Sequence, residues 1–458
     1  MAEAVPPAAQ SFPRTFWTAN LTELFERAAY YSMASFVVLY LGQLGLGDYW
    51  PSTLNGLLWT LVYFLPILSG TIADQVGFKR SLLVAFVLLA VGYFMMGYPV
   101  WFGGQPLSDK VAPEITAGAG VLVPVLLAIV FIGMGGSVVK PCITGTVQKT
   151  SGGRATLAFS IFYMVVNIGS LAGRGTSYLV RTHWSLSYIF AVAVACAAVA
   201  FVVVLLLYRD VESAGPAKPR RSIGRILLDM VLVLRNLRFA LFLLVLSGFW
   251  FIYNQVYNVI PLYLKKVVET DPAVDLYTMA NPFTIVFFQL LITRLFGKLK
   301  PIRSIVVGTV IISVAMLVNV VPVLLAGGVR ASVADWIPIG ALFAVLTVAM
   351  IAFGELFTSA RTFEYIGALA PKGQEGLFLG YANLPMAIGS LIGGPAGAAI
   401  FNEIMCHGAA KRPDGLLELD PTWNVAGWTV LMTIGLLSAA SMWLYNRWLQ
   451  RLQAAEAG

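Results

Sequence analysis

Charged residues are scarce in this chain. Of its 458 residues, 11% are Asp, Glu, Lys or Arg, whereas 59% are apolar, and the mean hydropathy is +0.81. A soluble domain carries about 25% charged residues, so this composition cannot cover its hydrocarbon with a water-facing surface. Most of the chain must lie in lipid, which excludes an ordinary soluble protein.

Histidine and cysteine are rare as well. The two histidines, His183 and His407, fall in predicted loops, and the three cysteines form no Cys-x-x-Cys pair. This argues against a disulfide scaffold or a thiolate metal site, and it leaves an enzyme without a nucleophile–base pair or a metal cluster. We expect no enzyme activity, no metal and no cofactor. The first residues lack a basic region followed by an apolar core, so no cleaved signal peptide is expected.

Long apolar runs make up most of the sequence, separated by polar, Gly-containing or Pro-containing turns. A membrane-spanning helix needs about 20 apolar residues. Twelve spans are predicted, at 16–41, 52–73, 79–98, 118–148, 154–180, 186–208, 239–266, 277–297, 303–325, 336–366, 374–400 and 422–448. The pattern predicts an all-α integral membrane protein with both termini on one side of the bilayer.

The basic residues of the loops orient the chain. Loops on the side of the termini carry 19 Lys and Arg residues, and loops on the other side carry 7. Positive loops remain in the cytoplasm, so both termini are predicted to be cytoplasmic, in a cell membrane. The net charge of +8 would suggest nucleic acid in a soluble protein, but this bias accounts for it and no nucleic-acid partner is expected.

The longest polar interruption divides the spans into six and six. It contains Pro216, Pro219 and a basic cluster, and its apolar residues recur at helical spacing. A helix on the inner membrane surface and a simple tether are both compatible with this segment. The predicted organisation is a cytoplasmic tail (1–15), an N-terminal six-helix bundle (16–208), a cytoplasmic linker (209–238), a C-terminal six-helix bundle (239–448) and a second cytoplasmic tail (449–458).

Eight charged residues fall inside the predicted spans, and their formal sum is zero. They are Arg27, Lys140, Arg174, Arg361, Glu23, Glu26, Glu355 and Glu364. A buried ion costs several kcal/mol, and an intramembrane ionisable group usually faces a wet cavity on an ion or substrate path. A neutral clamp between helices is the alternative. Arg361 is expected to pair with Glu364 three residues later, whereas Arg174 has no local acid.

In the first span the charges share one helix face with two tyrosines. The helical spacing places Glu23, Glu26, Arg27, Tyr30 and Tyr31 together. Two carboxylates compete for one guanidinium and cannot both be fully neutralised, so one should take up a proton readily. The pattern therefore predicts proton coupling without a histidine relay.

This motif resembles a known family. Glu23-Leu-Phe-Glu26-Arg27-Ala-Ala-Tyr30-Tyr31 looks like the ExxERFxYY motif of the proton-dependent oligopeptide transporters, within the major facilitator superfamily, with Ala28 in place of the motif Phe. Four further segments are similar to that family's patterns: Gly133 to Pro141 with Lys140, Phe162 to Ser170 with Asn167, Asn281-Pro282, and Gly354 to Ser359 with Glu355. The loop after the second span resembles the superfamily's cytoplasmic loop motif, which implies a structural or gating role for Gly70, Asp74, Gly77, Lys79 and Arg80.

The resemblance implies the major facilitator fold, twelve transmembrane helices in two six-helix bundles, and a monomer that imports di- or tripeptides, or similar small zwitterions, with protons by alternating access. Arg27 and Lys140 would bind the substrate's carboxylate and Glu355 its amino end. A Lys140–Glu355 salt bridge would join the bundles when the site is empty. Proton coupling would involve Glu23, Glu26, Arg27 and Glu355. The other implied substrate-binding residues are Tyr30, Tyr31, Tyr63, Asn167, Asn281 and Ser359.

Departures from the pattern keep other hypotheses open. No basic residue occurs between Arg27 and Lys79, where many bacterial members carry an outer-gate arginine, and Asn254 stands where many carry Glu. The linker is also too short for an additional helix pair.

A proton-linked carrier of another small anion or drug-like compound, such as nitrate, an amino acid or a peptide-like antibiotic, is the alternative that Arg174 and Asn254 favour. A non-transporting membrane receptor is the third. The two asparagines Asn167 and Asn281 could instead bond neighbouring helices.

Overall fold

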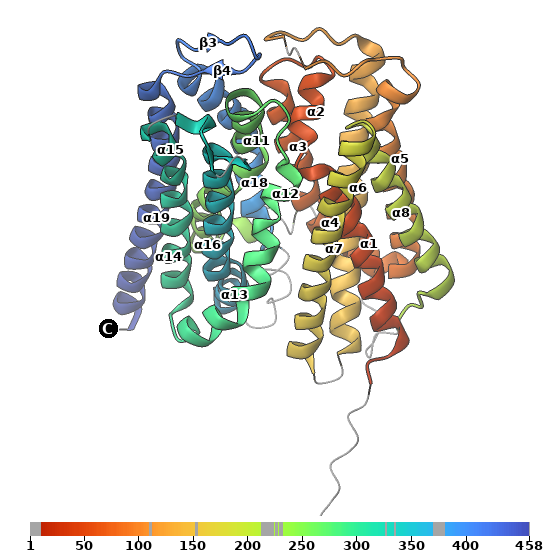
Figure 1. Cartoon of the computed structure of the whole chain (residues 1–458). Coiled ribbons are helices and arrows are strands. Elements are labelled where there is room, and N and C mark those ends of the chain that lie inside the picture. The colour runs from red at the N-terminus through yellow and green to blue at the C-terminus, as the bar shows by residue number, and fades with distance from the viewer. Residues whose placement is uncertain are drawn as a thin grey trace, which may run out of the picture.

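The computed structural model describes residues 11–109, 112–151, 154–211, 224, 228, 232–325, 328–333, 336–369 and 381–457. Helices dominate this part of the chain (Figure 1). Its strands form two short antiparallel hairpins, β1 (Ser332–Val333) with β2 (Ile337–Pro338) and β3 (Ala410–Lys411) with β4 (Leu417–Glu418). The helical content follows from the solvent, because in lipid a helix bonds its own backbone groups.

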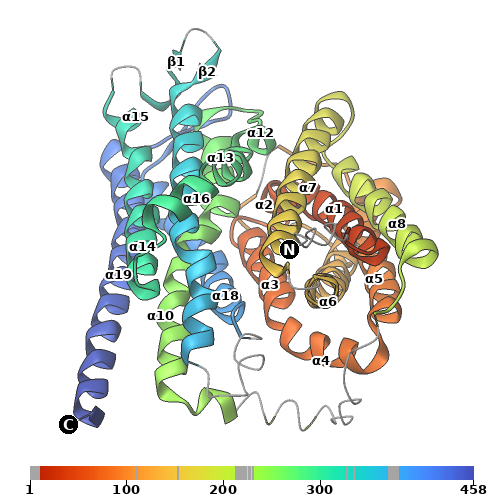
Figure 2. The ribbon, with the colours of Figure 1, turned by 90° about the horizontal axis from the view of Figure 1, so that it is seen from below.

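The first half of the chain forms one bundle, coloured red to yellow-green in Figures 1 and 2. Helix α1 packs against α7 and α8, and α6 packs against α3 and α5. The bounds of these helices are α1 (Arg14–Ala34), α2 (Val37–Gln43), α3 (Trp50–Phe64), α4 (Pro66–Val76), α5 (Phe78–Trp101), α6 (Ala119–Thr150), α7 (Ala155–His183) and α8 (Tyr188–Leu207).

The second half forms the other bundle, in which α14 packs against α16 and α19, and α10 against α18 and α19. Short 3-10 and π segments (η) interrupt its spans. The elements are α10 (Leu237–Asn254), η1 (Gln255–Tyr257), α11 (Val259–Tyr263), η2 (Leu264–Val268), α12 (Val274–Thr278), α13 (Ala280–Phe296), α14 (Pro301–Leu317), η3 (Val318–Val320), α15 (Val321–Leu324), η4 (Gly328–Arg330), α16 (Ile339–Leu369), α18 (Leu384–Ala399), η5 (Ile400–Met405) and α19 (Pro421–Ala457).

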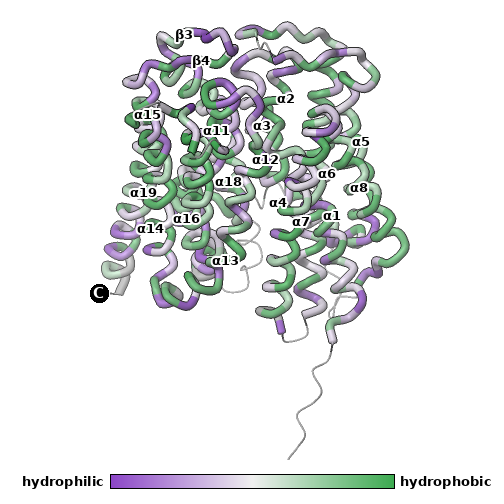
Figure 3. The backbone as a smooth tube through the Cα atoms, in the orientation of Figure 1, coloured by the Kyte–Doolittle hydropathy of each residue, from purple (hydrophilic) through white to green (hydrophobic). Residues whose placement is uncertain are grey.

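Ten helical segments of the described chain are long and apolar enough to cross a membrane, and the pair α3–α4, bent by 41°, makes an eleventh. The first predicted span, α1 with α2, is not among them. Its 21-residue α1 contains Glu23, Glu26 and Arg27, and these charges lower its hydropathy. Figure 3 shows hydrophobic residues along the bundles and hydrophilic residues gathered toward the two ends. The chain is a multi-pass membrane protein.

Among the described residues, four ion pairs join the two bundles through the end of α7, the loops that follow α2 and α5, and the η2 and α12 segments. They are Arg181–Asp271, Arg181–Asp275, Lys265–Asp109 and Lys266–Asp48. Figure 1 shows α2 and α11 toward the end of the molecule that carries the hairpins. Toward the end that carries the C-terminus, the ribbons of the two bundles spread apart. The protein is therefore closed at the hairpin end. Most of the 209–238 linker lies outside the described residues, so the linker helix and the domain boundaries stay predictions.

Candidate functional site

Three charged side chains of α1 meet inside the N-terminal bundle. Arg27 Nε lies 3.3 Å from Glu23 Oε1 and also donates a hydrogen bond to Glu26 Oε2. All three side chains are at most 6% exposed. Two carboxylates thus share one guanidinium, as their spacing predicts. Neither carboxylate oxygen of Glu23 receives a hydrogen bond from the described residues, so Glu23 is the less stabilised of the two acids.

Two glycines of α7 set the position of this helix face. An added Cβ would lie 2.7 Å from the Leu24 carbonyl oxygen at Gly169 and 2.4 Å from the Ala28 carbonyl oxygen at Gly173. The α7 backbone therefore presses directly on α1, on the turns next to Arg27. This contact fixes the position of the α1 turns that carry Arg27 relative to α7.

Aromatic rings surround the cations of the N-terminal bundle. The Arg27 guanidinium carbon lies 5.4 Å from the Tyr30 ring centroid, and Lys140 Nζ lies 5.6 Å from that of Tyr63. Trp59 connects the two tyrosines, with its ring 5.9 Å from Tyr30 and 5.6 Å from Tyr63. Trp59 was not among the predicted site residues, although Trp59 precedes Tyr63 by one helical turn. These rings make a cation-lined wall that suits a small amphipathic ligand.

Glu355 of α16 lies in the opposite bundle among neutral donors. Asn281 Nδ2 donates to Glu355 Oε2 at 3.4 Å, and Ser359 Oγ donates to Oε1 at 3.5 Å. The Glu355 side chain is half-buried. Asn281, Ser359 and Glu355 are therefore brought together as the motif predicts. Both hydrogen bonds are long, so the carboxylate keeps acceptor capacity for a stronger donor.

The predicted Lys140–Glu355 salt bridge is absent: the ion pairs of the described residues do not include it. Lys140 belongs to α6 and Glu355 to α16 of the opposite bundle, so a bridge between them depends on how the two bundles are placed. The expected bridge is therefore not formed in this conformation.

Asn167 occupies its donor within its own helix. Asn167 Nδ2 donates to the Tyr163 carbonyl oxygen at 2.8 Å, and the residue is 5% exposed. This bond lies within α7, so it is not the bond to a neighbouring helix that the sequence left as the alternative. The expected hydrogen bond from Asn167 to a substrate stays a prediction.

Arg361 and Glu364 are paired, as predicted. Arg361 Nη1 lies 2.5 Å from Glu364 Oε2, and its Nη2 donates to the Gly297 carbonyl oxygen at 2.6 Å. Glu364 is half exposed. The pair links α16 to the end of α13 and serves a structural role.

Asp210, which was not among the predicted site residues, anchors the loop between α4 and α5. Gly77 has φ +98°, a conformation that favours glycine. The Lys79 backbone N–H donates to Asp210 Oδ1 at 2.8 Å, and Lys79 Nζ donates to the Leu205 carbonyl oxygen at 3.0 Å. The loop is thereby tied to the end of α8. Of the remaining motif residues, Gly70 packs against Pro141, and Asp74 and Arg80 are exposed.

Arg174 of α7 is the charge for which sequence analysis found no partner. It is fully buried and donates to Ser170 Oγ, to Thr278 Oγ1 at 3.1 Å and to the Tyr257 hydroxyl at 3.1 Å. Its guanidinium carbon lies 4.4 Å from the Tyr31 ring centroid. The ion pairs of the described residues give it no carboxylate. Arg174 therefore joins the two bundles through hydroxyl groups.

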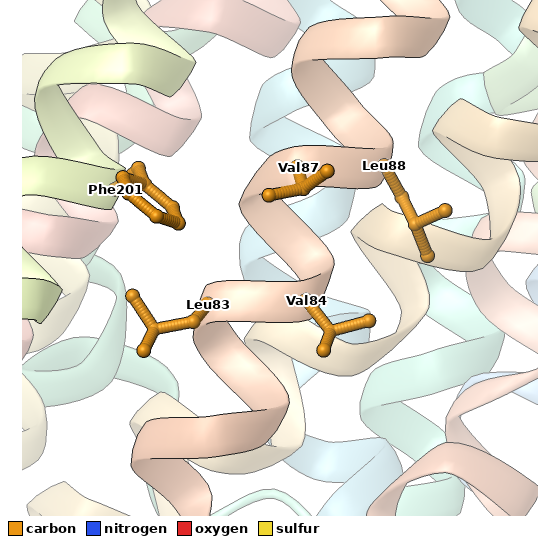
Figure 4. A pocket seen from close by; sticks show the side chains of 5 residues that line it. All are labelled: Leu83, Val84, Val87, Leu88 and Phe201. Carbon is orange, nitrogen blue, oxygen red and sulfur yellow. The ribbon is translucent and has the colours of Figure 1, made fainter.

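A shallow groove on the outside of the N-terminal bundle is unrelated to these charges. Leu83, Val84, Val87 and Leu88 of α5 and Phe201 of α8 line it (Figure 4), and its volume is about 240 Å³. It offers no polar group to orient a zwitterion. A lipid chain is the occupant that its chemistry fits.

Residues 28–394 match the family model described as Major Facilitator Superfamily. This chain belongs to that superfamily. The predicted fold class is thereby confirmed, and the structure agrees. A POT family transporter solved in complex with a thioalcohol-conjugated peptide superposes with a TM-score of 0.74, at 19% identity over 95% of this chain and 96% of that one. A peptide transporter POT in complex with sulfate gives a TM-score of 0.73, at 17% identity over 96% of each chain.

Sequence relatives agree with the finer resemblance. The dipeptide and tripeptide permease B of Shigella dysenteriae is 24% identical over 97% of both chains. The dipeptide and tripeptide permease A of Escherichia coli is 24% identical over 86% of this chain and 85% of that protein. These superfamily relatives are permeases, and both span almost the same length as this chain.

Proposed function

We propose that this superfamily member is a proton-coupled symporter that imports di- or tripeptides, or similar small zwitterions. The observation that carries the proposal is the division of charge between the bundles. Arg27 and Lys140 lie in one bundle, and Glu355 lies in the other. A zwitterion bound between them would place its carboxylate at the cations and its ammonium at the acid. The similarity to a dipeptide and tripeptide permease and to a transporter solved with a peptide conjugate supports the same substrate class.

Each end of the substrate would meet suitable chemistry. Arg27 can offer a bidentate fork to a carboxylate, and Lys140 adds a point charge. Glu355, held by weak neutral donors, would accept the stronger hydrogen bonds of an ammonium group. Because the Lys140–Glu355 bridge is not formed, both groups are available to the substrate. In a second conformation, Glu355 would pair with Lys140 and release it.

Proton coupling would centre on the shared guanidinium of α1. Arg27 cannot satisfy both Glu23 and Glu26, and Glu23 lacks hydrogen bonds. Protonation of Glu23 would remove one of the two carboxylates that share Arg27, so more of the positive charge and donor capacity of the guanidinium would be available to the substrate's carboxylate. This links the presence of a proton to the binding of an anion.

Alternating access would use the two bundles as rocking units. With the positive-inside assignment, the closed hairpin end faces outward and the spread end faces the cytoplasm of a cell membrane. The proposed site uses residues of one chain, which is consistent with a functional monomer. Protons would be the coupling ion, without a further cofactor.

The test is uptake of a labelled dipeptide into proteoliposomes under an imposed pH gradient. We expect uptake to rise with an inward proton gradient and Glu23→Gln to lose that dependence while retaining exchange. Glu364→Gln, a matched change in the Arg361 pair, should behave like the parent. Uptake that ignores the gradient would refute the coupling, and absence of any dipeptide uptake would refute the substrate class.

Arg174 favours a second candidate, a proton-linked carrier of another small anion. Three cations near the space between the bundles could hold a more negative ligand than a zwitterion. A competition screen of dipeptides, amino acids and nitrate against one binding signal separates the two candidates. Peptides should compete best under the main proposal, and nitrate or an amino acid should compete best under the alternative.

A further inference from the structure

We infer that Arg174 is a latch that closes the outward end of the protein and must release in every transport cycle. The inference rests on the proposed alternating-access function and adds a positioning residue to it. Arg174 lies on α7, and two of its acceptors, Thr278 and Tyr257, belong to α12 and η1 of the opposite bundle. Its third acceptor, Ser170, lies on α7 itself.

The acceptors of Arg174 explain why it can act as a latch rather than a permanent clamp. A buried ion pair is strongly destabilised when one charge is removed from the other. Arg174 instead donates to hydroxyl groups, which can exchange these hydrogen bonds for water when the bundles part. The guanidinium keeps Ser170 and the face of Tyr31, 4.4 Å away, on its own bundle. Opening therefore exposes a cation to water without leaving a buried carboxylate unpaired.

The surroundings of Arg174 belong to the same seam. Ser35 Oγ, at the break between α1 and α2, lies 2.9 Å from Thr278 Oγ1. On α3, Asn55 Nδ2 donates to Asn258 Oδ1 at 3.1 Å and to the Tyr257 carbonyl oxygen at 3.3 Å. These contacts also connect the two bundles, and they are uncharged. Arg174 is thus the charged member of this group of contacts, separate from the four ion pairs of Arg181, Lys265 and Lys266 that also join the bundles.

Close packing continues the seam on the neighbouring helix pair. An added Cβ at Gly56 of α3 would lie 2.5 Å from the Ser390 carbonyl oxygen, and one at Gly394 of α18 would lie 2.3 Å from the Ser52 carbonyl oxygen. The two backbones touch without intervening side chains. These backbone contacts contribute little directional bonding, so the hydrogen bonds of Arg174, together with the four ion pairs between the bundles, should set the opening equilibrium.

The test measures opening of the seam by labelling a single cysteine. Cys142, Cys196 and Cys406 are replaced, Ser35→Cys is introduced, and a membrane-impermeant maleimide is added outside intact cells. A hydrogen bond to a charged group is worth roughly a tenfold change in an equilibrium constant. We expect Tyr257→Phe to label about tenfold faster, Arg174→Gln faster still, and Arg174→Lys at a rate between Arg174→Gln and the parent.

A double variant and a matched control complete the design. Arg174→Gln with Tyr257→Phe should label no more than about twofold faster than Arg174→Gln alone, because both changes remove the same bond. Tyr40→Phe removes another buried tyrosine hydroxyl, whose hydrogen bond to the Met96 carbonyl oxygen stays within one bundle. It should leave the labelling rate unchanged.

Labelling of Tyr257→Phe within about twofold of the parent would overturn the inference, even if Arg174→Gln fails to fold. Faster labelling in Tyr40→Phe as well would also overturn it, because the effect would then be general loosening. The measurement uses neither peptide nor a pH gradient. A protein that shows the latch but transports no dipeptide would refute the proposed substrate and leave the latch standing.

Discussion

The shared guanidinium of α1 makes a quantitative prediction about stability. Removing one partner of a buried ion pair costs about 3–5 kcal/mol when it leaves an unpaired charge. Here, Glu23→Gln leaves Arg27 with its bond to Glu26, and Glu26→Gln leaves it with Glu23 at 3.3 Å. Each single change should therefore lower the free energy of unfolding by no more than about 1–2 kcal/mol. Glu23→Gln should cost less than Glu26→Gln, because Glu23 accepts no hydrogen bond.

The double variant should behave differently. Glu23→Gln with Glu26→Gln leaves the Arg27 guanidinium buried without a carboxylate on its helix, so we expect a loss of about 3–5 kcal/mol. If each single change costs about 1 kcal/mol, the excess of the double loss over their sum should be about 1–3 kcal/mol. Equilibrium unfolding in mixed detergent–SDS micelles, followed by tryptophan fluorescence, measures all four proteins. Single and double losses that add to within about 0.5 kcal/mol would refute the sharing of one cation by two acids.

Three further predictions follow from other contacts. Gly173→Leu forces a side chain into the Ala28 carbonyl oxygen and should destabilise the protein by about 1–3 kcal/mol. Gly120→Ala adds a Cβ that meets no atom within 4 Å and should leave stability unchanged. Thermal unfolding of the two variants and the parent measures the difference. Asp210→Ala should lower stability by about 1–2 kcal/mol, because the Lys79 N–H loses its acceptor; the same melts test this, and an unchanged midpoint would contradict it. Burial raises the pKa of Glu269, so folding favours its protonated form. The free energy of unfolding of the parent should therefore fall relative to that of Glu269→Gln as the pH rises from 5 to 8. Parallel profiles of unfolding free energy against pH for the two proteins would contradict this.

Contacts within one helix could be predicted well from the sequence. The pairing of Arg27 with both Glu23 and Glu26, and that of Arg361 with Glu364, both follow from helical spacing, which fixes which side chains share a face. The motif residues Asn281 and Glu355 also meet as the resemblance implies. The first span was predicted at 16–41 from its apolar residues, although Glu23, Glu26 and Arg27 lower its mean hydropathy.

Contacts between distant segments were harder to predict. Asp210 lies in the polar segment after the sixth predicted span, and nothing in the sequence there distinguishes it from other loop charges. Asp210 accepts the Lys79 N–H only because the end of α8 lies beside the loop between α4 and α5. Trp59 and Tyr257 looked like ordinary apolar residues of spans, yet their rings lie 4.8 Å apart across the two bundles. No local pattern marks such a pair, because it is created by helix packing.

The missing Lys140–Glu355 bridge and the Arg174 contacts have one physical explanation. A transporter sequence encodes two arrangements of the same bundles, and a contact across the bundles is required in only one of them. Rigid bundles that touch at the outward end cannot also touch fully at the cytoplasmic end, so a bond near one end excludes a bond near the other. The bonds of Arg174 to Thr278 and Tyr257 are formed here, and the Lys140–Glu355 bridge is not. If both act as gates, stabilising the bridge must weaken the latch, and the variant Tyr257→Phe should favour the conformation in which Lys140 and Glu355 meet.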